Sequence, residues 1–312
     1  MKKINCAVIG TGYLGRFHAE KYTKLSNTAL IAVCDFDPNR SREIAQIYHT
    51  ASYTDYRQLI GKVDAVSIAA TTSSHYEIAK VFLENKVHVL LEKPLTTTVA
   101  EAQELIILAR TNEVILQAGH LERFNPAFIA LDKYVAAPQL ITVSRLAPYK
   151  PRGNDVSVVL DLMIHDLELV QHLVKAKIKK ITARTATLIS PTPDVASAYI
   201  EFENGCIANL TASRLSPHTE RSLTVVQNDG YFFCKLDTKT LDINRKDNAA
   251  VLPATISEKL TFEKSDALLD EITAFTDAII NRKSPVVSGE DGAQALETAL
   301  KIERNYELGI KN

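Results

Sequence analysis

The stretch INCAVIGTGYLG, residues 4–15, decides the fold of the first part of this 312-residue chain. Six residues with the pattern of a buried β-strand, 4–9, lead directly into a G-x-G-x-x-G motif at Gly10, Gly12 and Gly15. A helical pattern follows at about 13–25. A strand, a glycine turn and a helix in this order are typical of the phosphate-binding turn of a dinucleotide-binding α/β unit. A glycine turn without a ligand is the alternative, and the flanking strand and helix argue against it.

The same unit extends to about residue 120, because strand and helix patterns keep alternating. Such alternation predicts a parallel sheet with helices on both faces. Asp35 ends the second strand, about 20 residues beyond Gly15, where an acid accepts hydrogen bonds from a ribose 2′-hydroxyl. We therefore expect NAD as cofactor, although Arg40 and Arg42 leave NADP open. The predicted strands are 4–9, 29–34, 63–68, 87–91 and 114–117, and the predicted helices are about 13–25, 38–48, 74–85 and 98–111.

The second part of the chain has a different pattern, in which strands follow one another directly. Asn204-Gly205 and Asp229-Gly230 are hairpin turns between such strands. The predicted strands are 139–145, 181–189, 195–203, 206–213, 222–227 and 231–234, and the predicted helices are about 124–134, 156–174, 265–281 and 289–307.

The predicted fold class is therefore α/β, with an N-terminal Rossmann doubly wound parallel sheet and a C-terminal α/β domain with a large, mostly antiparallel open sheet. The domains are expected at 1–120, for the dinucleotide, and 121–312, for substrate binding and oligomerisation. The last helix could pack back on the first domain. Tyr199 alternates with Ala198 and Ile200, so the sheet has apolar side chains on both faces. Helices cover one face, and we expect the other to meet a second subunit.

Composition excludes several other classes of protein. Lys plus Arg is 36 and Asp plus Glu is 37, which leaves no excess of positive charge for nucleic acid. No apolar run approaches the ~18 residues of a membrane span, and the first residues lack the apolar core of a signal peptide. Four dispersed cysteines without C-x-x-C favour reduced thiols in the cytoplasm. The eight histidines are scattered, so we expect no metal site.

Two motifs carry the expected chemistry. Lys93, in Glu92-Lys93-Pro94, ends the fifth strand, and ligands lie outside the carboxyl ends of such strands. Its ammonium can donate to a substrate hydroxyl and stabilise a forming alkoxide. Asp161 and His165 have i,i+4 spacing in a helix, so the carboxylate can orient a histidine that takes a proton near neutral pH. A surface lysine and a structural ion pair are the alternatives.

Together these motifs resemble the Gfo/Idh/MocA oxidoreductase family over the whole chain. The resemblance implies oxidation or reduction of sugars or cyclitols with NAD(H) or NADP(H), and it gives Lys93, Asp161 and His165 the catalytic positions. Segments 119–126, 148–152, 155–166 and 287–292 further resemble the UDP-N-acetylglucosamine 3-dehydrogenases of this family. This implies oxidation of a sugar 3-hydroxyl ahead of transamination in lipid A assembly. A free sugar, a cyclitol or a sugar acid is the alternative substrate, and a non-catalytic dinucleotide-binding regulator is the alternative function.

The motifs and the resemblance together give a list of site residues. His120 and Arg123 lie at the junction of the two parts, and a basic loop at 145–152 suits a substrate pyrophosphate. The expected partners are a small sugar or nucleotide sugar and further copies of the chain, as a homodimer or homotetramer. The cofactor is expected to contact Gly10, Gly12, Tyr13, Leu14, Gly15, Asp35, Arg40, Thr71, His75, Glu92 and Lys93, and the substrate His120, Arg123, Arg145, Tyr149 and Arg152.

Overall fold

The computed structural model describes residues 3–150, 156–247 and 254–307, which form two compact units. Unit 1 contains Met1–Leu121 and Asp266–Leu296, and unit 2 contains Glu122–Ser265 and Glu297–Asn312. The first division falls one residue beyond the boundary expected from the sequence. Asp266–Leu296, which the sequence analysis assigned to the second domain, is part of unit 1.

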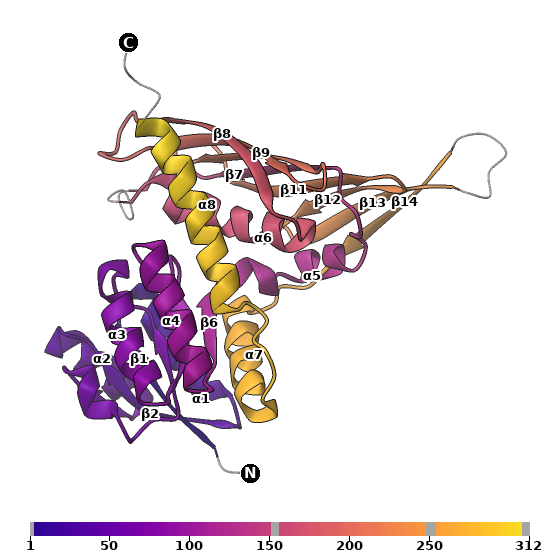
Figure 1. The fold of residues 1–312 in the computed structure, drawn as a ribbon. Coiled ribbons are helices and arrows are strands. Elements are labelled where there is room, and N and C mark those ends of the chain that lie inside the picture. The colour runs from indigo at the N-terminus through magenta and orange to yellow at the C-terminus, as the bar shows by residue number, and fades with distance from the viewer. Residues whose placement is uncertain (1–2, 151–155, 248–253, 308–312) are drawn as a thin grey trace. The chain divides into compact units, whose positions relative to one another are not determined.

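Unit 1 is built on a six-stranded parallel sheet in the order β3-β2-β1-β4-β5-β6 (Figure 1). This order confirms the predicted doubly wound Rossmann sheet. The strands are β1 (Ile4–Ile9), β2 (Thr28–Cys34), β3 (Ala51–Tyr53), β4 (Ala65–Ile68), β5 (His88–Glu92) and β6 (Leu116–Gly119). The sequence analysis missed β3, because it is only three residues long and its side chains are mostly exposed.

The helices of unit 1 begin where their sequences supply caps. Asp37 accepts a hydrogen bond from the backbone N–H of Asn39 at 2.9 Å, and Pro38 opens the helix. Thr98 and Glu101 form a reciprocal capping box at the start of a second helix. The helices are α1 (Tyr13–Lys24), α2 (Pro38–Tyr48), α3 (Thr72–Glu84), α4 (Val99–Thr111), α7 (Ala267–Asn281) and the first part of α8 (Gly289–Glu307), with the short 3-10 helix η1 (Tyr56–Leu59).

Helix α7 belongs to unit 1 because its apolar face completes the core of that unit. Leu268, Ile272 and Phe275 recur at helical spacing and are buried in the same cluster as residues of β1, β2, β4, β5, α1 and α2. Ile272 and Phe275 are fully buried. The core of the Rossmann unit therefore needs a helix that the chain supplies after unit 2.

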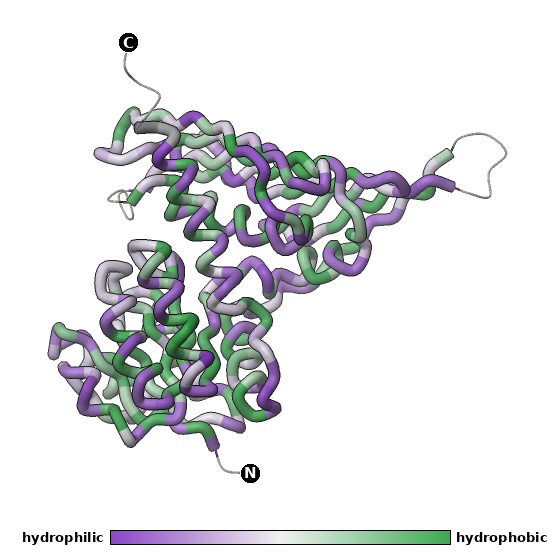
Figure 2. The backbone as a smooth tube through the Cα atoms, viewed as in Figure 1, coloured by the Kyte–Doolittle hydropathy of each residue, from purple (hydrophilic) through white to green (hydrophobic). Residues whose placement is uncertain are grey.

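Unit 2 is built on an eight-stranded sheet in the order β14-β13-β12-β11-β7-β10-β9-β8 (Figure 1). Only β7 and β10 pair in parallel, which confirms the predicted, mostly antiparallel sheet. Hydrophobic and hydrophilic segments alternate along it (Figure 2). The strands are β7 (Leu140–Leu146), β8 (Ile178–Ala186), β9 (Val195–Phe202), β10 (Ile207–Ser213), β11 (Glu220–Gln227), β12 (Gly230–Lys235), β13 (Thr240–Lys246) and β14 (Thr255–Thr261).

The helices of unit 2 differ from prediction in one important place. The expected continuous helix at 156–174 is a π-helical turn, η3 (Val159–Met163), followed by the α-helix α6 (Ile164–Val174). π turns occur frequently at functional sites, and this one contains Asp161. The expected helix at 124–134 is likewise a 3-10 turn, η2 (Leu121–Phe124), and a short helix, α5 (Pro126–Asp132).

Within the described residues no helix is long and apolar enough to cross a membrane.

Candidate active site

The glycine turn of unit 1 depends on two close contacts that only glycine permits. Gly10 has a φ of 87°, and a β-carbon there would lie 2.7 Å from the backbone of Ala69. A β-carbon at Gly15 would lie 1.7 Å from the carbonyl oxygen of Gly10. Gly12 caps α1 without a side chain, which leaves the first turn of the helix open to an anion. The local geometry therefore fits a pyrophosphate at this turn.

Asp35 lies at the carboxyl end of β2 and is oriented by three hydrogen bonds. Its Oδ2 accepts from the backbone N–H and the hydroxyl of Thr11, at 2.7 and 3.0 Å, and its Oδ1 accepts from the backbone N–H of Asp37 at 3.0 Å. The carboxylate is thus fixed beside the glycine turn. Its oxygens have further lone pairs, which can accept from ribose hydroxyls.

A cavity of about 590 Å³ follows this edge of the sheet. Gly10, Gly12, Asp35, Arg40 and Thr71 all line it, so the structure brings five of the predicted cofactor residues together. They come from the turns after β1, β2 and β4 and from α2, which meet where the strand order reverses. Phe36 adds a large apolar side chain, 84% exposed.

Other predicted cofactor residues do not line this cavity. The Tyr13 ring is largely exposed and packs edge-on against Phe17, and Leu14 and Gly15 lie in the first turn of α1. His75 is buried, with its ring nitrogens 3.0 Å from the Pro94 carbonyl oxygen and 3.1 Å from that of Ala70. Burial lowers the pKa of His75, and the hydrogen bonds partly oppose that shift. This geometry favours a role for His75 in holding the turns after β4 and β5.

Glu92 and Lys93 lie at the carboxyl end of β5, in the same unit. Glu92 is buried, and its Oε1 lies 2.9 Å from Nε2 of His18 on α1. Its Oε2 accepts from the backbone N–H of Lys93 at 3.3 Å. Burial alone would raise the pKa of Glu92, but the bond to His18 and the charge of Lys93 lower it. Glu92 is therefore an ionised carboxylate that holds the start of the Lys93 turn.

The sequence analysis missed two residues of this cluster, His18 and Glu271. His18 follows Gly15 by one helical turn, so it projects from the helix that opens at the glycine motif. Glu271 lies on α7 between Leu268 and Ile272, on the buried face of that helix. An acid placed within an apolar helical stripe is the signal that could have drawn attention to it.

Asp161 and His165 lie in unit 2, in η3 and at the second residue of α6, and both are partly buried. The backbone N–H of Asp161 donates to the carbonyl of Ser157 at 2.9 Å. The side chain of Ser157 is hydrogen-bonded to Glu303 of α8, so the start of this segment is held by a second helix.

Two predicted substrate residues, Arg145 and Arg123, are engaged within unit 2. The Arg145 guanidinium is buried and donates to Asp166 at 2.7 Å and to Glu122 at 3.0 Å. Arg123 is buried and pairs with Glu168 at 2.6 Å. We therefore assign Arg145 to the buried charge cluster rather than to a substrate pyrophosphate, since removing it would take away the guanidinium that binds the buried Asp166 carboxylate.

The remaining substrate residues are only partly placed. His120 follows β6 in unit 1 and is buried, with its backbone N–H bonded to Ala118. Tyr149 is half-buried, and Arg152 lies outside the described residues. Lys150 is exposed. No group of three or more His, Cys, Asp or Glu side chains able to hold a metal ion occurs in the described ranges.

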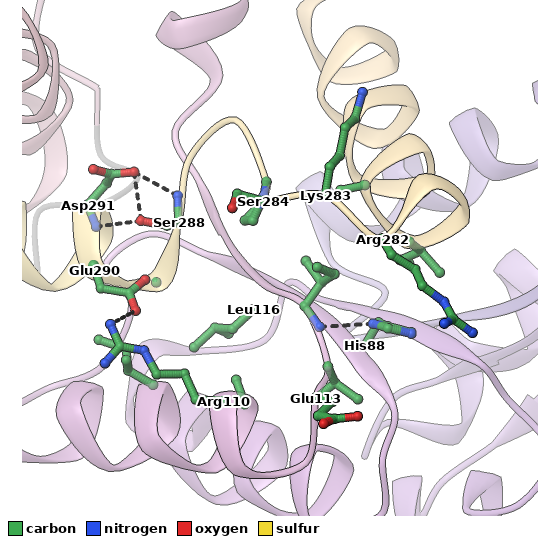
Figure 3. A pocket seen from close by; sticks show the side chains of 18 residues that line it. His88, Arg110, Glu113, Leu116, Arg282, Lys283, Ser284, Ser288, Glu290 and Asp291 are labelled. Atoms are coloured by element: carbon green, nitrogen blue, oxygen red, sulfur yellow. Dashed lines mark hydrogen bonds and ion pairs between the residues drawn. The ribbon is translucent and has the colours of Figure 1, made fainter.

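A larger cavity in unit 1, of about 1000 Å³, lies at the amino ends of β5 and β6 (Figure 3). Within its lining, Arg110 donates to Glu290 at 2.6 Å, and Asp291 accepts from Ser288 at 2.8 Å. None of the predicted site residues lines it. Ligands of open α/β sheets bind at the carboxyl ends, so the smaller cavity is the better candidate for the cofactor.

Two alanine variants separate the structural glycine from the binding glycine. Gly15→Ala forces a methyl group into the Gly10 carbonyl, so we expect a loss of about 3–5 kcal/mol in the free energy of unfolding, or no folded protein. The methyl group of Gly12→Ala has no atom within 4 Å, so this variant should unfold at the same temperature as the parent chain. Its methyl group occupies the surface that a pyrophosphate approaches, so NADH should bind at least about tenfold more weakly.

Thermal unfolding and fluorescence titration with NADH measure the two effects. Normal NADH binding by Gly12→Ala would contradict the assignment of the pyrophosphate to this turn.

Comparisons with known proteins agree with a dinucleotide-binding unit at the start of the chain. Residues 4–120 match the model of the oxidoreductase family with an NAD-binding Rossmann fold, GFO_IDH_MocA, and residues 142–233 match the GFO/IDH/MocA C-terminal domain. A UDP-N-acetylglucosamine 3-dehydrogenase from Acidithiobacillus ferrooxidans is 35% identical over 305 residues, 97% of each chain. A scyllo-inositol 2-dehydrogenase (NAD(+)) from Bacillus subtilis is 26% identical over 99% of this chain and 95% of its own.

The solved structures extend the likeness to three dimensions. The structure of the A. ferrooxidans enzyme has a TM-score of 0.92, with 34% identity and 99% of both chains covered. A levoglucosan dehydrogenase in complex with NADH has a TM-score of 0.88 at 18% identity, over 98% of both chains, and supports the fold alone. By sequence, fold and cofactor site, this chain belongs to the Gfo/Idh/MocA family of NAD-dependent oxidoreductases.

Proposed function

We propose that this dehydrogenase oxidises the 3-hydroxyl of UDP-N-acetylglucosamine, or of a similar nucleotide sugar. The observation that carries the proposal is the likeness to the UDP-N-acetylglucosamine 3-dehydrogenase, which is 35% identical over 97% of both chains. Likeness at this level is not confined to the dinucleotide unit, because it spans both units of the chain.

The proposed chemistry uses three side chains. His165 takes the proton of the sugar hydroxyl, and the Lys93 ammonium donates a hydrogen bond to the oxygen as negative charge develops there. Asp161 orients the His165 ring and favours its protonated form. Bound NAD⁺ would accept the hydride that leaves the carbon carrying this hydroxyl.

The cofactor and the reacting hydroxyl are assigned to the same edge of the sheet in unit 1. Asp35 and the glycine turn follow β2 and β1, so the adenosine half of NAD belongs to that side of the switch point. The nicotinamide half then belongs to the side of β4 and β5, where Lys93 follows the last residue of β5.

The nucleotide part of the substrate needs cations for its pyrophosphate. Arg145 is engaged with Asp166 and Glu122. We therefore propose that Lys150 and Arg152 bind the substrate pyrophosphate, together with Tyr149, which directly precedes Lys150. A cyclitol needs no such cations. The inositol dehydrogenases among the relatives make cyclitols the second candidate substrate class.

A direct comparison of substrates tests the proposal. The purified chain, NAD⁺ and either UDP-N-acetylglucosamine, N-acetylglucosamine, myo-inositol or scyllo-inositol are mixed, and NADH formation is followed by absorbance. We expect the highest kcat/KM with UDP-N-acetylglucosamine. A higher value with either inositol would replace the nucleotide sugar by a cyclitol.

The catalytic roles predict a specific pattern of losses. Lys93→Ala and His165→Ala should each lower kcat by ~10²–10⁴-fold, the range for a general acid–base group, while the Kd of NADH barely changes. Asp161→Asn should cost less, because it orients a base and transfers no proton. The double variant should lose less than the product of the two single losses.

Exposed side chains of the same types provide controls. Lys133→Ala and His218→Ala should leave kcat unchanged, since both residues lie on the surface of unit 2. Full activity of His165→Ala would remove this residue as the base.

We also propose a homodimer or homotetramer that uses the open face of the eight-stranded sheet. Ala198, Ile200 and Phe202 of β9 are buried, whereas Tyr199 on the opposite face stays partly exposed. Leu140 of β7 and Tyr231 of β12, which lie on the same face of the sheet, are exposed as well. Light scattering at micromolar concentration measures the mass in solution, and the mass of a single chain would exclude the oligomer.

A further inference from the structure

Unit 1 contains a second buried acid behind the Lys93 turn, on an element that the proposed reaction does not use. Glu271 of α7 is fully buried, and neither of its side-chain oxygens has a hydrogen-bond partner among the described residues. Gln117 of β6 approaches the same place, since its amide donates to the backbone carbonyl of Glu271 at 3.2 Å while its own Oε1 has no partner. A buried ionised carboxylate without partners is very costly, so Glu271 must carry a proton.

Glu271 and Glu92 interact electrostatically, and only Glu92 is ionised. Burial, and then the charge of Glu92, raise the pKa of Glu271 well above its ordinary value. Glu92 keeps its charge because His18 and the Lys93 backbone amide bind its two oxygens. Two neighbouring buried acids that differ in this way bind one proton between them.

The position of the Glu92 carboxylate depends on the absence of a side chain at Gly119. Glu92 pairs with Gly119 across β5 and β6, and a β-carbon at Gly119 would lie 3.1 Å from the Glu92 carboxyl group. Among the described residues, the other ionisable groups that interact with Glu92 or Glu271, directly or through Tyr22, are His18 and Tyr22 on α1, Cys6 on β1, His75 on α3 and Lys93 itself. Tyr22 is hydrogen-bonded to Ser67 at 2.8 Å, and burial raises its pKa and that of Cys6, so neither adds charge near neutral pH.

We propose that Glu271 is a positioning residue for the dehydrogenase reaction: as a neutral acid, it confines a single negative charge to Glu92, where that charge binds His18 and the Lys93 amide. The assignment of Lys93 to the reaction rests on the proposed function. When Glu271 loses its proton, two carboxylates compete for one buried site, and Glu92 can no longer hold both partners. The Lys93 turn is then released and turnover falls.

The proton on Glu271 can be detected without any substrate. The infrared spectrum of the whole protein near neutral pH should contain the carbonyl band of a buried protonated carboxyl group, and Glu271→Gln should remove it. Asp270→Asn, an exposed carboxyl one residue earlier on α7, is the matched control and should leave the band in place. Persistence of the band in Glu271→Gln would overturn the assignment of the proton.

The pH dependence of the free energy of unfolding also reports on the proton of Glu271. Because the pKa of Glu271 is raised in the folded state, that state binds one proton more than the unfolded chain above the ordinary pKa of a glutamate. The contribution of Glu271 therefore makes the free energy of unfolding fall as the pH rises, up to the pKa in the folded state. Glu271→Gln should lose this dependence, and Asp270→Asn should keep it. Should Glu271→Gln fold poorly, Glu271→Met serves as an apolar variant with the same loss.

The pH profile of turnover separates positioning from packing. For each protein, kcat is divided by its maximum over the pH range. In Glu271→Gln the fall of kcat at high pH should occur at least about one pH unit higher than in the parent chain. The Kd of NADH should change less than about twofold. An unshifted limb, with the infrared band lost, would leave Glu271 a purely structural acid and overturn the positioning role. Absence of turnover with every sugar tested would count against the proposed function alone. In that case the infrared band of Glu271 is compared with and without NADH. A band that NADH does not change would reject the coupling of Glu271 to the cofactor edge.

Discussion

The close approach of α1 to β1 at Gly15 is the constraint on which the rest of unit 1 depends. A methyl group has no room there, so helix and strand meet backbone to backbone at the turn. The same contact points the first turn of α1 toward the carboxyl edge of the sheet, and Gly10 brings this turn against Ala69, after β4. The turns that follow β1 and β4 are therefore in contact where the strand order reverses, and a cofactor site exists there before any side chain contributes.

The side chains of α1 extend this arrangement into the interior. His18 lies one helical turn beyond Gly15 and reaches Glu92 at the end of β5. One helix thus offers its amino end to the cofactor and its buried face to the turn that contains Lys93. Unit 2 has a buried charge cluster of a different kind. Arg145 is paired with both Asp166 and Glu122, whereas Glu271 in unit 1 lacks a partner for its carboxyl group among the described residues. The paired cluster can be explained by structure alone, and the unpaired acid calls for a functional reason.

Local patterns in the sequence were sufficient for most of the architecture. Residues 4–15 predicted the strand, the turn and the helix, and Asn204-Gly205 and Asp229-Gly230 predicted hairpins that the structure contains. Features that depend on tertiary contacts were out of reach. The sequence of 156–174 is mostly apolar, so its periodicity does not distinguish a π turn from an α-helix. Arg145 stands in a basic segment, but its partners Asp166 and Glu122 are 21 and 23 residues away, and only the fold brings them to it. The placement of α7 in unit 1 depends on contacts with strands more than 200 residues earlier.

That placement has a consequence for the order in which the chain can fold during its synthesis. Ile272 and Phe275 are fully buried among residues of β1, β2 and α1, so residues 1–121, when they leave the ribosome, contain the complete sheet of unit 1 but lack part of its core. Synthesis proceeds at ~5–20 residues per second, and Glu122–Ser265 of unit 2 emerge before α7 does. The nascent Rossmann sheet must therefore wait roughly ten seconds or more, with the surface that α7 will cover still exposed. The core of unit 1 is therefore completed only after most of unit 2 has been synthesised.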